Sequence, residues 1–312
     1  MREAGGLKRR LADLSRDAYN RPDRNYRILD PLPMPASFSS RNNQLPTGKS
    51  LRIGAVNYLN TKPLVYGLER LLPEACFVYD LPSRLADALA AGELDIALVP
   101  SVELARHPDW KIVSDACIAC RGPVLSVKMM FRIAPARVRS LSLDEGSRTS
   151  AMLAQVLLQK IHGVRPRLEM LPIGAAPATA NTDAVLVIGD KAIQSENQSG
   201  VEVWDLGDRW CRWAERPFVF AMWVARAGVD ATPVARVLAA ARDDGCRHLA
   251  EIAQLEAAAM RLPRKLVLDY FRRNLHFQLG ASERGGLEYF FAQVAWLEAA
   301  NALQPAAPSG VR

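Results

Sequence analysis

The stretch LPSRLADALAAGELDIALVPS, residues 81–101, decides the fold class. Its first part, SRLADALAAGE, has apolar residues at helical spacing and reaches Gly92, a residue type that commonly ends helices. Its second part, LDIALVP, contains the apolar run IALVP, which has the length of a strand. The strand pattern CFVYDLP (76–82) precedes it, so the order is strand, helix, strand. This order favours right-handed crossovers and a largely parallel sheet.

The alternation of strands and helices continues on both sides of this stretch. A short apolar strand, LRIGAVNYL (51–59), comes before it. Two longer apolar strands, VLSVKMMFRI (124–133) and PFVFAMWVAR (217–226), enclose a middle α/β block, and the chain is helical from there almost to its end. We therefore predict a two-lobed α/β fold with two crossing strands and a helical C-terminus. The first lobe comprises residues 51–134 and 218–305, the second comprises 135–217, and 306–312 form a tail.

The positive charge of the chain is concentrated near its N-terminus. The sequence holds 40 Lys and Arg against 33 Asp and Glu, a net charge of +7, of which residues 1–50 contribute ten basic and five acidic residues. The other residues carry only +2, which argues against a nucleic-acid-binding surface. Residues 1–50 are proline-rich in their second half. We predict that they form a flexible basic N-terminal extension or reflect a start codon placed too early.

The sequence lacks the patterns of export and of membrane insertion. Residues 1–50 contain no apolar core of a secretory signal, and no run of about 18 apolar residues occurs. The cysteines are scattered, and the pair Cys117 and Cys120 lies in an apolar run without a second pair at zinc spacing. We expect two buried thiols and a cytoplasmic protein whose partners include neither nucleic acid nor membrane.

Polar residues at strand ends and helix starts are the candidates for a ligand site, because ligands of open α/β sheets bind there. Ser101 is expected to cap a helix, either as a cap alone or as a cap that also contacts a carboxylate. Ser147, Thr149 and Ser150 open another helix. An ordinary cap needs one of these hydroxyls, whereas all three beside free N–H groups would hold a carboxylate. Arg148 is either solvated or a bidentate contact.

The sequence contains neither a metal site nor a familiar catalytic motif. The four histidines are far apart and lie in or beside helical segments. No P-loop, nucleophile elbow or dinucleotide fingerprint occurs. The residues alone therefore identify no general base. The histidines are His107, His162, His248 and His276.

An ordered set of motifs resembles one known family. The chain is similar to the chorismate dehydratase family of menaquinone biosynthesis, which acts in the futalosine route, and the similarity covers nearly all of residues 51–230. The motifs that carry it are RIGAVNYLNTKPLVYGL (52–68), LPSRLADALAAGELDIALVPSVELAR (81–106), GPVLSV (122–127), SRTSAML (147–153), AVLVIGDKAI (184–193) and DLGDRWCRWAERPFVFAMWVAR (205–226).

The resemblance implies a fold, a reaction and a set of site residues. The fold is that of type II periplasmic binding proteins, and the reaction removes water from chorismate, a small dianion, to give 3-[(1-carboxyvinyl)oxy]benzoate without a metal or organic cofactor. Asn60 and Ser126 match the active-site positions of the family, although an Asn in a turn or a Ser in an apolar strand is usually structural. The expected substrate contacts are Ser101, Ser147, Thr149, Ser150 and, more weakly, Asn57.

Other functions remain open at this stage. One is a lyase like 1,4-dihydroxy-6-naphthoate synthase of the same route, and another is a non-enzymatic binding protein for a small carboxylate. A transcriptional effector domain is a third. For the dehydratase, the missing base leads to the hypothesis that the side-chain carboxylate of the substrate removes the proton.

Overall fold

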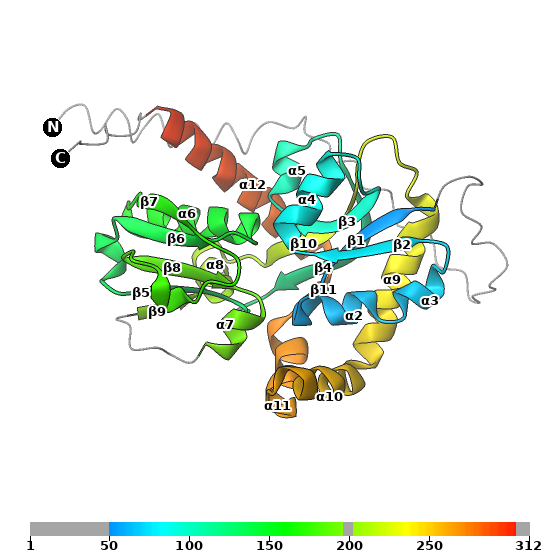
Figure 1. The fold of residues 1–312 in the computed structure, drawn as a ribbon. Coiled ribbons are helices and arrows are strands. Elements are labelled where there is room, and N and C mark those ends of the chain that lie inside the picture. The colour runs from blue at the N-terminus through cyan, green and yellow to red at the C-terminus, as the bar shows by residue number, and fades with distance from the viewer. Residues whose placement is uncertain (1–49, 196–201, 304–312) are drawn as a thin grey trace.

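Two β-sheets, each with helices packed against it, lie side by side in the computed structural model, which describes residues 50–195 and 202–303 (Figure 1). The predicted extension, apart from Ser50, and the predicted tail 306–312 lie outside the described residues. One sheet has six strands in the order β11 (His276–Gln278), β4 (Lys111–Cys120), β10 (Phe218–Ala225), β3 (Ile96–Pro100), β1 (Arg52–Val56), β2 (Cys76–Asp80). The other has five, in the order β7 (Arg167–Leu171), β6 (Ser140–Asp144), β8 (Ala184–Ile188), β5 (Val127–Phe131), β9 (Glu202–Asp205).

The helices follow the strands as the alternation predicts. Helix α4 links β2 to β3, and β1 pairs in parallel with both strands, so the strand–helix–strand prediction for residues 76–100 is confirmed. Because β10 runs antiparallel to β3 and β4, however, the sheet is mixed rather than largely parallel. The helices are α2 (Lys62–Val65), α3 (Leu68–Leu71), α4 (Pro82–Ala90), α5 (Glu103–Arg106), α6 (Arg148–His162), α7 (Asp190–Gln194), α8 (Leu206–Ala214), α9 (Thr232–Arg247), α10 (Leu249–Met260), α11 (Arg264–Asp269) and α12 (Ala281–Ala302).

The first passage between the sheets differs from the predicted strand 124–133. The long strand of the six-stranded sheet is β4, which contains the buried thiols of Cys117 and Cys120. Residues 121–126 then leave this sheet without strand structure, and β5 pairs with β8 and β9 in the five-stranded sheet. The predicted first lobe, 51–134, therefore includes a strand that belongs to the second sheet. Periodicity shows that 124–133 is apolar, but it does not show which sheet receives it.

Residues 206–217 lead from β9 in the five-stranded sheet back to β10 in the six-stranded sheet and form the second passage, and helix α12 connects the two halves of the molecule a third time. It packs beside β10 and extends across to α6 (Figure 1). Near its end, Lys160 Nζ lies 3.3 Å from the centroid of the Trp296 ring, and Arg165 Nη1 donates to the Ala300 carbonyl oxygen at 3.1 Å. In the described part of the chain, no helix combines the length and the hydrophobicity needed to cross a membrane.

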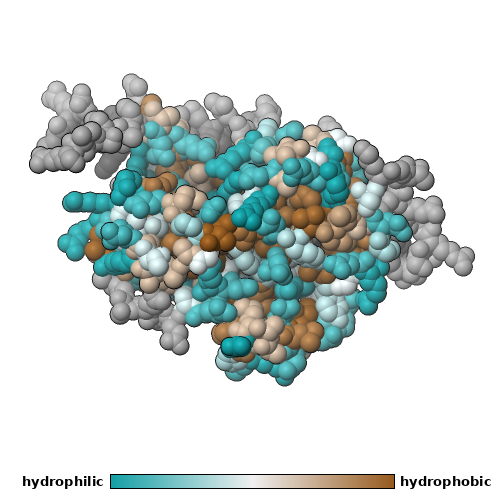
Figure 2. Space-filling model, in the orientation of Figure 1, coloured by the Kyte–Doolittle hydropathy of each residue, from teal (hydrophilic) through white to brown (hydrophobic). Residues whose placement is uncertain are grey.

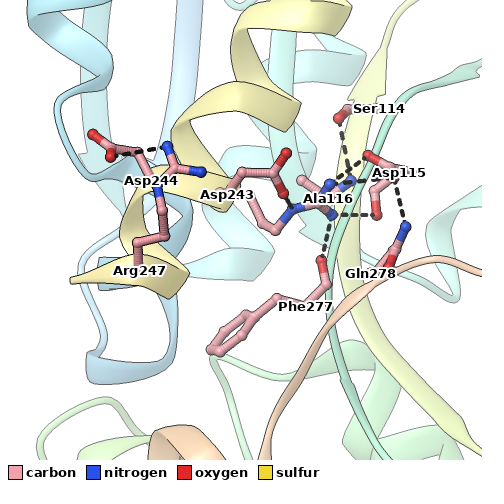
Figure 3. A network of polar contacts seen from close by, with 9 residues as sticks. Ser114, Asp115, Ala116, Asp243, Asp244, Arg247, Phe277 and Gln278 are labelled. Atoms are coloured by element: carbon pink, nitrogen blue, oxygen red, sulfur yellow. Dashed lines mark hydrogen bonds and ion pairs between the residues drawn. The ribbon is translucent and has the colours of Figure 1, made fainter. Parts of the chain in front are cut away.

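A buried arginine attaches α9 to the six-stranded sheet. Arg242 Nη1 donates to the Phe277 carbonyl oxygen at 3.1 Å, and its Nη2 lies 3.2 Å from Asp115 Oδ1. Figure 3 shows the network around Asp115, to which Gln278 also donates. Because a buried charge without a partner is costly, this pairing fixes α9 against β4 and β11.

A second polar cluster joins the ends of β1, β3 and β10, and it makes stability depend on pH. Asp95 accepts hydrogen bonds from Arg52 Nη2 at 2.9 Å and from Arg226 Nη2 at 2.8 Å. Burial raises the pKa of Asp95, but the bonds from Arg52 and Arg226 outweigh it and lower this pKa from 3.8 to about 2. The ionised carboxylate therefore stabilises the fold above the unfolded pKa, and this stabilisation disappears as pH falls through the folded pKa.

We expect Asp95→Asn to lower the free energy of unfolding at pH 7 by about 1–2 kcal/mol, because charged hydrogen bonds are lost. The difference from the wild type should shrink as pH falls from about 4 toward 2. Urea unfolding at several pH values measures it, with the exposed Asp109→Asn as the matched control. A difference that stays constant between pH 7 and pH 2.5 would contradict this assignment.

Candidate active site

A pocket lies between the two sheets, where strands from both halves end. Its walls are mostly apolar, and its polar side chains are hydroxyls, one phenol and one amide. On the face drawn in Figure 2, the periphery of the molecule is largely hydrophilic and hydrophobic residues gather nearer the middle. The lining residues are Val56, Tyr58, Asn60, Pro82, Pro100, Ile118, Val124, Ser126, Val127, Ser147, Thr149, Ser150, Ile188, Gly189, Phe220 and Ala221.

Asn60 lies in the 3-10 turn η1 (Leu59–Thr61), directly after β1. The turn is fixed to the opposite half of the molecule, because Leu59 N donates to Asp190 Oδ1 at 3.1 Å. The Thr61 hydroxyl donates to Asn60 Oδ1 at 3.3 Å, whereas Asn60 Nδ2 has no hydrogen-bond partner within residues 50–195 and 202–303. The amide N–H groups therefore remain available to an oxygen in the pocket.

Ser126 lies immediately before β5, in the passage between the sheets and not on a strand as predicted. Its N–H donates to the Val124 carbonyl oxygen at 2.7 Å, which closes a three-residue turn around Leu125. Its own carbonyl oxygen accepts from Gly189 N at 2.8 Å. The Ser126 backbone is thus fixed on both sides, while its side chain lines the pocket.

The start of α6 supplies three hydroxyls, and they have different partners. Ser147 is the cap, because its Oγ accepts from Ser150 N at 3.3 Å. Thr149 Oγ1 accepts from Val102 N at 3.2 Å and lies 3.4 Å from Ser101 Oγ, which joins the two halves. One cap is therefore sufficient, as expected, and all three hydroxyls also line the pocket.

Two predicted contacts do not line the pocket. Ser101 does not cap α5, since its Oγ donates to the Val219 carbonyl oxygen at 2.7 Å and Val102 precedes the helix. Asn57 is exposed just beyond the end of β1, and its Oδ1 accepts from Lys62 Nζ at 3.1 Å. Each side chain is directed to a partner that local sequence does not specify.

Tyr58 and Gly189 also line the pocket, although neither is among the substrate contacts expected from the sequence. A Cβ on Gly189 would lie 3.2 Å from the Tyr58 ring, and Gly189 has a φ of 66°, so glycine permits this close approach. Burial, followed by the charges of Asp144 and Asp190, raises the pKa of Tyr58. The phenol therefore stays protonated and can donate. Tyr58 lies within the VNYLN motif, but strand periodicity alone does not indicate that Tyr58, and not a neighbouring residue, faces the pocket.

Among the described residues, no Asp, Glu, His, Lys or Arg side chain lines this pocket. His107 stacks on Trp110 and His248 on Tyr66, away from the pocket. Arg148 does not line this pocket: its half-exposed side chain pairs with Asp87 across the two halves, with Nη2 2.7 Å from Asp87 Oδ1. The described residues also contain no cluster of three or more His, Cys, Asp or Glu suited to a metal ion.

Solved structures with the same fold are distant in sequence. Protein AF1704 from Archaeoglobus fulgidus superposes with a TM-score of 0.65 at 13% identity, covering 82% of this chain and 98% of that one. The periplasmic aliphatic sulphonate-binding protein SsuA from Escherichia coli has a TM-score of 0.51 at 18% identity, covering 85% and 96%. These similarities confirm the two-lobed periplasmic-binding-protein fold with its helical C-terminus.

Comparisons of sequence find a relative that is more similar to this chain than these solved structures are. A chorismate dehydratase from Thermus thermophilus is 29% identical over 256 residues, which cover 76% of this chain and 93% of the relative. The profile of the family described as menaquinone biosynthesis matches residues 51–295, which contain all the lining residues of the pocket. The chain therefore belongs to the menaquinone biosynthesis family.

Proposed function

We propose that this protein is a chorismate dehydratase, which eliminates water from chorismate to give 3-[(1-carboxyvinyl)oxy]benzoate in the futalosine route to menaquinone. The observation that carries the proposal is the composition of the pocket in a chain of this family. Asn60, Ser126 and the α6 hydroxyls converge on one apolar space, and no described Asp, Glu, His, Lys or Arg side chain lines it. We assign the reaction to the cytoplasm, as the family resemblance implies.

The pocket offers dipoles instead of formal charges to a dianionic substrate. Helix α6 is 15 residues long, and its first turn faces the pocket through Thr149 and Ser150. The N-terminus of a helix of this length carries free N–H groups and a partial positive charge, both of which stabilise a carboxylate. The apolar walls, for example Phe220 and Ile188, fit the ring of the substrate.

The reaction needs a proton removed from the ring and a hydroxide expelled from it. A C–H and a C–O bond break, the ring becomes aromatic, and the proton and the hydroxide leave as water. We assign orientation of the substrate and stabilisation of the developing charge to the Asn60 amide and the Ser126 hydroxyl. Because no described lining side chain is a base, we assign proton removal to the carboxylate of the enolpyruvyl side chain.

Incubation with chorismate tests the function directly. We expect a product 18 mass units lighter, the mass of one water, with the ultraviolet absorbance of a substituted benzoate. Controls without protein and with heat-treated protein measure spontaneous breakdown of chorismate. Tight binding of chorismate without product would leave the binding-protein function instead. If the protein did not convert chorismate but did convert a later intermediate of the route, the naphthoate-synthase-like lyase would be favoured.

A further inference from the structure

The passage that carries Ser126, residues 121–126, is held by side chains from distant parts of the chain. Arg121 Nε lies 2.8 Å from Glu283 Oε1, and Asn274 Nδ2 donates to the Pro123 carbonyl oxygen at 2.8 Å. A Cβ on Gly207 would lie 2.7 Å from the Gly122 carbonyl oxygen, so α8 approaches the passage as closely as glycine allows. The passage between the sheets is therefore a fixed element and not a loose linker.

Asp205 makes the most extensive contact with this passage. Its Oδ2 accepts from Leu125 N at 2.7 Å, and both of its oxygens accept from Val124 N, at 2.9 and 3.0 Å. Asp205 also caps α8, because Oδ1 accepts from Asp208 N at 3.1 Å. A cap needs only that last bond. The bonds to Val124 and Leu125 are additional, and they span about 80 residues of sequence.

The turn held by Asp205 has an unfavourable backbone conformation. Leu125 has a φ of 60°, a value that residues with a branched side chain rarely adopt, and the hydrogen bond from Ser126 N to Val124 O encloses it. Such a conformation persists where surrounding contacts impose it, and it is concentrated at functional sites. Here the imposed conformation ends at Ser126, whose side chain lines the pocket.

We propose that Asp205 is a positioning residue for Ser126, because it holds the turn that directs the serine side chain into the pocket. The proposal rests on the proposed function for its kinetic part. It extends the site to the DLG sequence at 205–207, which does not line the pocket. Asp205 therefore acts through Ser126.

The test is a double-mutant cycle with chorismate as substrate. Asp205→Asn keeps the shape of the side chain but presents an amide N–H to the backbone N–H groups. We expect Asp205→Asn to lower kcat about 10–100-fold, with KM changed less than about threefold. In a Ser126→Ala background it should change kcat less than about twofold. The matched control is Asp208→Asn, which removes the carboxylate that pairs with Arg212.

Several results would overturn the proposal. If Asp205→Asn had wild-type kcat, or if it lowered kcat equally in the wild-type and Ser126→Ala backgrounds, Asp205 would not act through Ser126. Hydrogen exchange of the Val124 and Leu125 amides gives a readout without turnover, with protection expected in the wild type and loss of it in Asp205→Asn. If these amides exchanged rapidly in the wild type, Asp205 would not hold the turn, and this result would stand even if Asp205→Asn failed to fold. If the wild type showed no turnover but its Val124 and Leu125 amides were protected, the proposed function would be refuted. The hydrogen bonds by which Asp205 holds the turn would then still be supported.

Discussion

Ser126→Ala should lower kcat for chorismate dehydration by about 10²–10³-fold, the usual effect of removing one positioned donor from a charge-stabilising site. The Ser126 side chain lines the pocket from a backbone that is fixed by hydrogen bonds to Val124 and Gly189, so its hydroxyl is such a positioned donor. Asn60→Ala has an effect of the same size, because its amide is the only such group among the described lining residues. Steady-state kinetics with chorismate, monitored by product absorbance, measures both.

The control for this prediction is another buried serine. Ser114 lies in β4, where its Oγ accepts from Ala116 N, and it is not among the lining residues of the pocket. Ser114→Ala should keep kcat within about twofold of the wild type, and all three variants should unfold cooperatively. Wild-type turnover in both Ser126→Ala and Asn60→Ala would refute the site assignment. Loss of turnover in Ser114→Ala would show that the kinetics report packing rather than chemistry.

Gly286→Ala lowers the melting temperature, although the same change inside an exposed helix normally stabilises by up to about 1 kcal/mol. A Cβ at this position of α12 would lie 2.2 Å from the Pro217 carbonyl oxygen, which also accepts a bond from Trp210 Nε1. Since this oxygen is held, the helix has to move. We expect a loss of about 1–3 kcal/mol and a melting temperature lower by roughly 2–10 °C.

The neighbouring residue provides a matched control. A Cβ on Gly285 would have Arg216 Nη1 as its nearest contact, at 3.6 Å, which is ordinary packing distance. Gly285→Ala should therefore leave the melting temperature unchanged or raise it by roughly 1–3 °C. Differential scanning calorimetry of both variants measures the contrast. Equal shifts in the two variants would show that α12 does not approach Pro217 as closely as the structure has it.

Much of the fold follows from local pattern. The helix and strand within residues 81–101 were predictable because apolar spacing, Gly92 and strand length all agree. Ser147, Thr149 and Ser150 were selected as residues at a helix start, whereas Asn60 and Ser126 were selected by the resemblance to the family. All five line one pocket, because strand ends and helix starts meet between the sheets. Their roles in the reaction stay predictions.

Long-range partners account for what the sequence did not reveal. The sequence of residues 124–126 is typical of a strand. The backbone conformation at Leu125 is nevertheless set by Asp205, which is 80 residues away. Ser101 has the local pattern of a cap, yet its hydroxyl bonds to the Val219 carbonyl oxygen, 118 residues away. Periodicity and capping rules describe neighbours along the chain, so contacts of this kind lie outside them.

The third connection made by α12 limits how the pocket can open. Two bodies joined at two points can still rotate about the line through those points. Helix α12 leaves this line: its Trp296 contacts Lys160 of α6, and its Ala300 contacts Arg165 just beyond α6, at positions about 15–20 Å along the helix from Gly286. Rotation would pull these contacts apart or bend the helix, so this degree of freedom is restrained, and the exchange of substrate for product must work against that restraint.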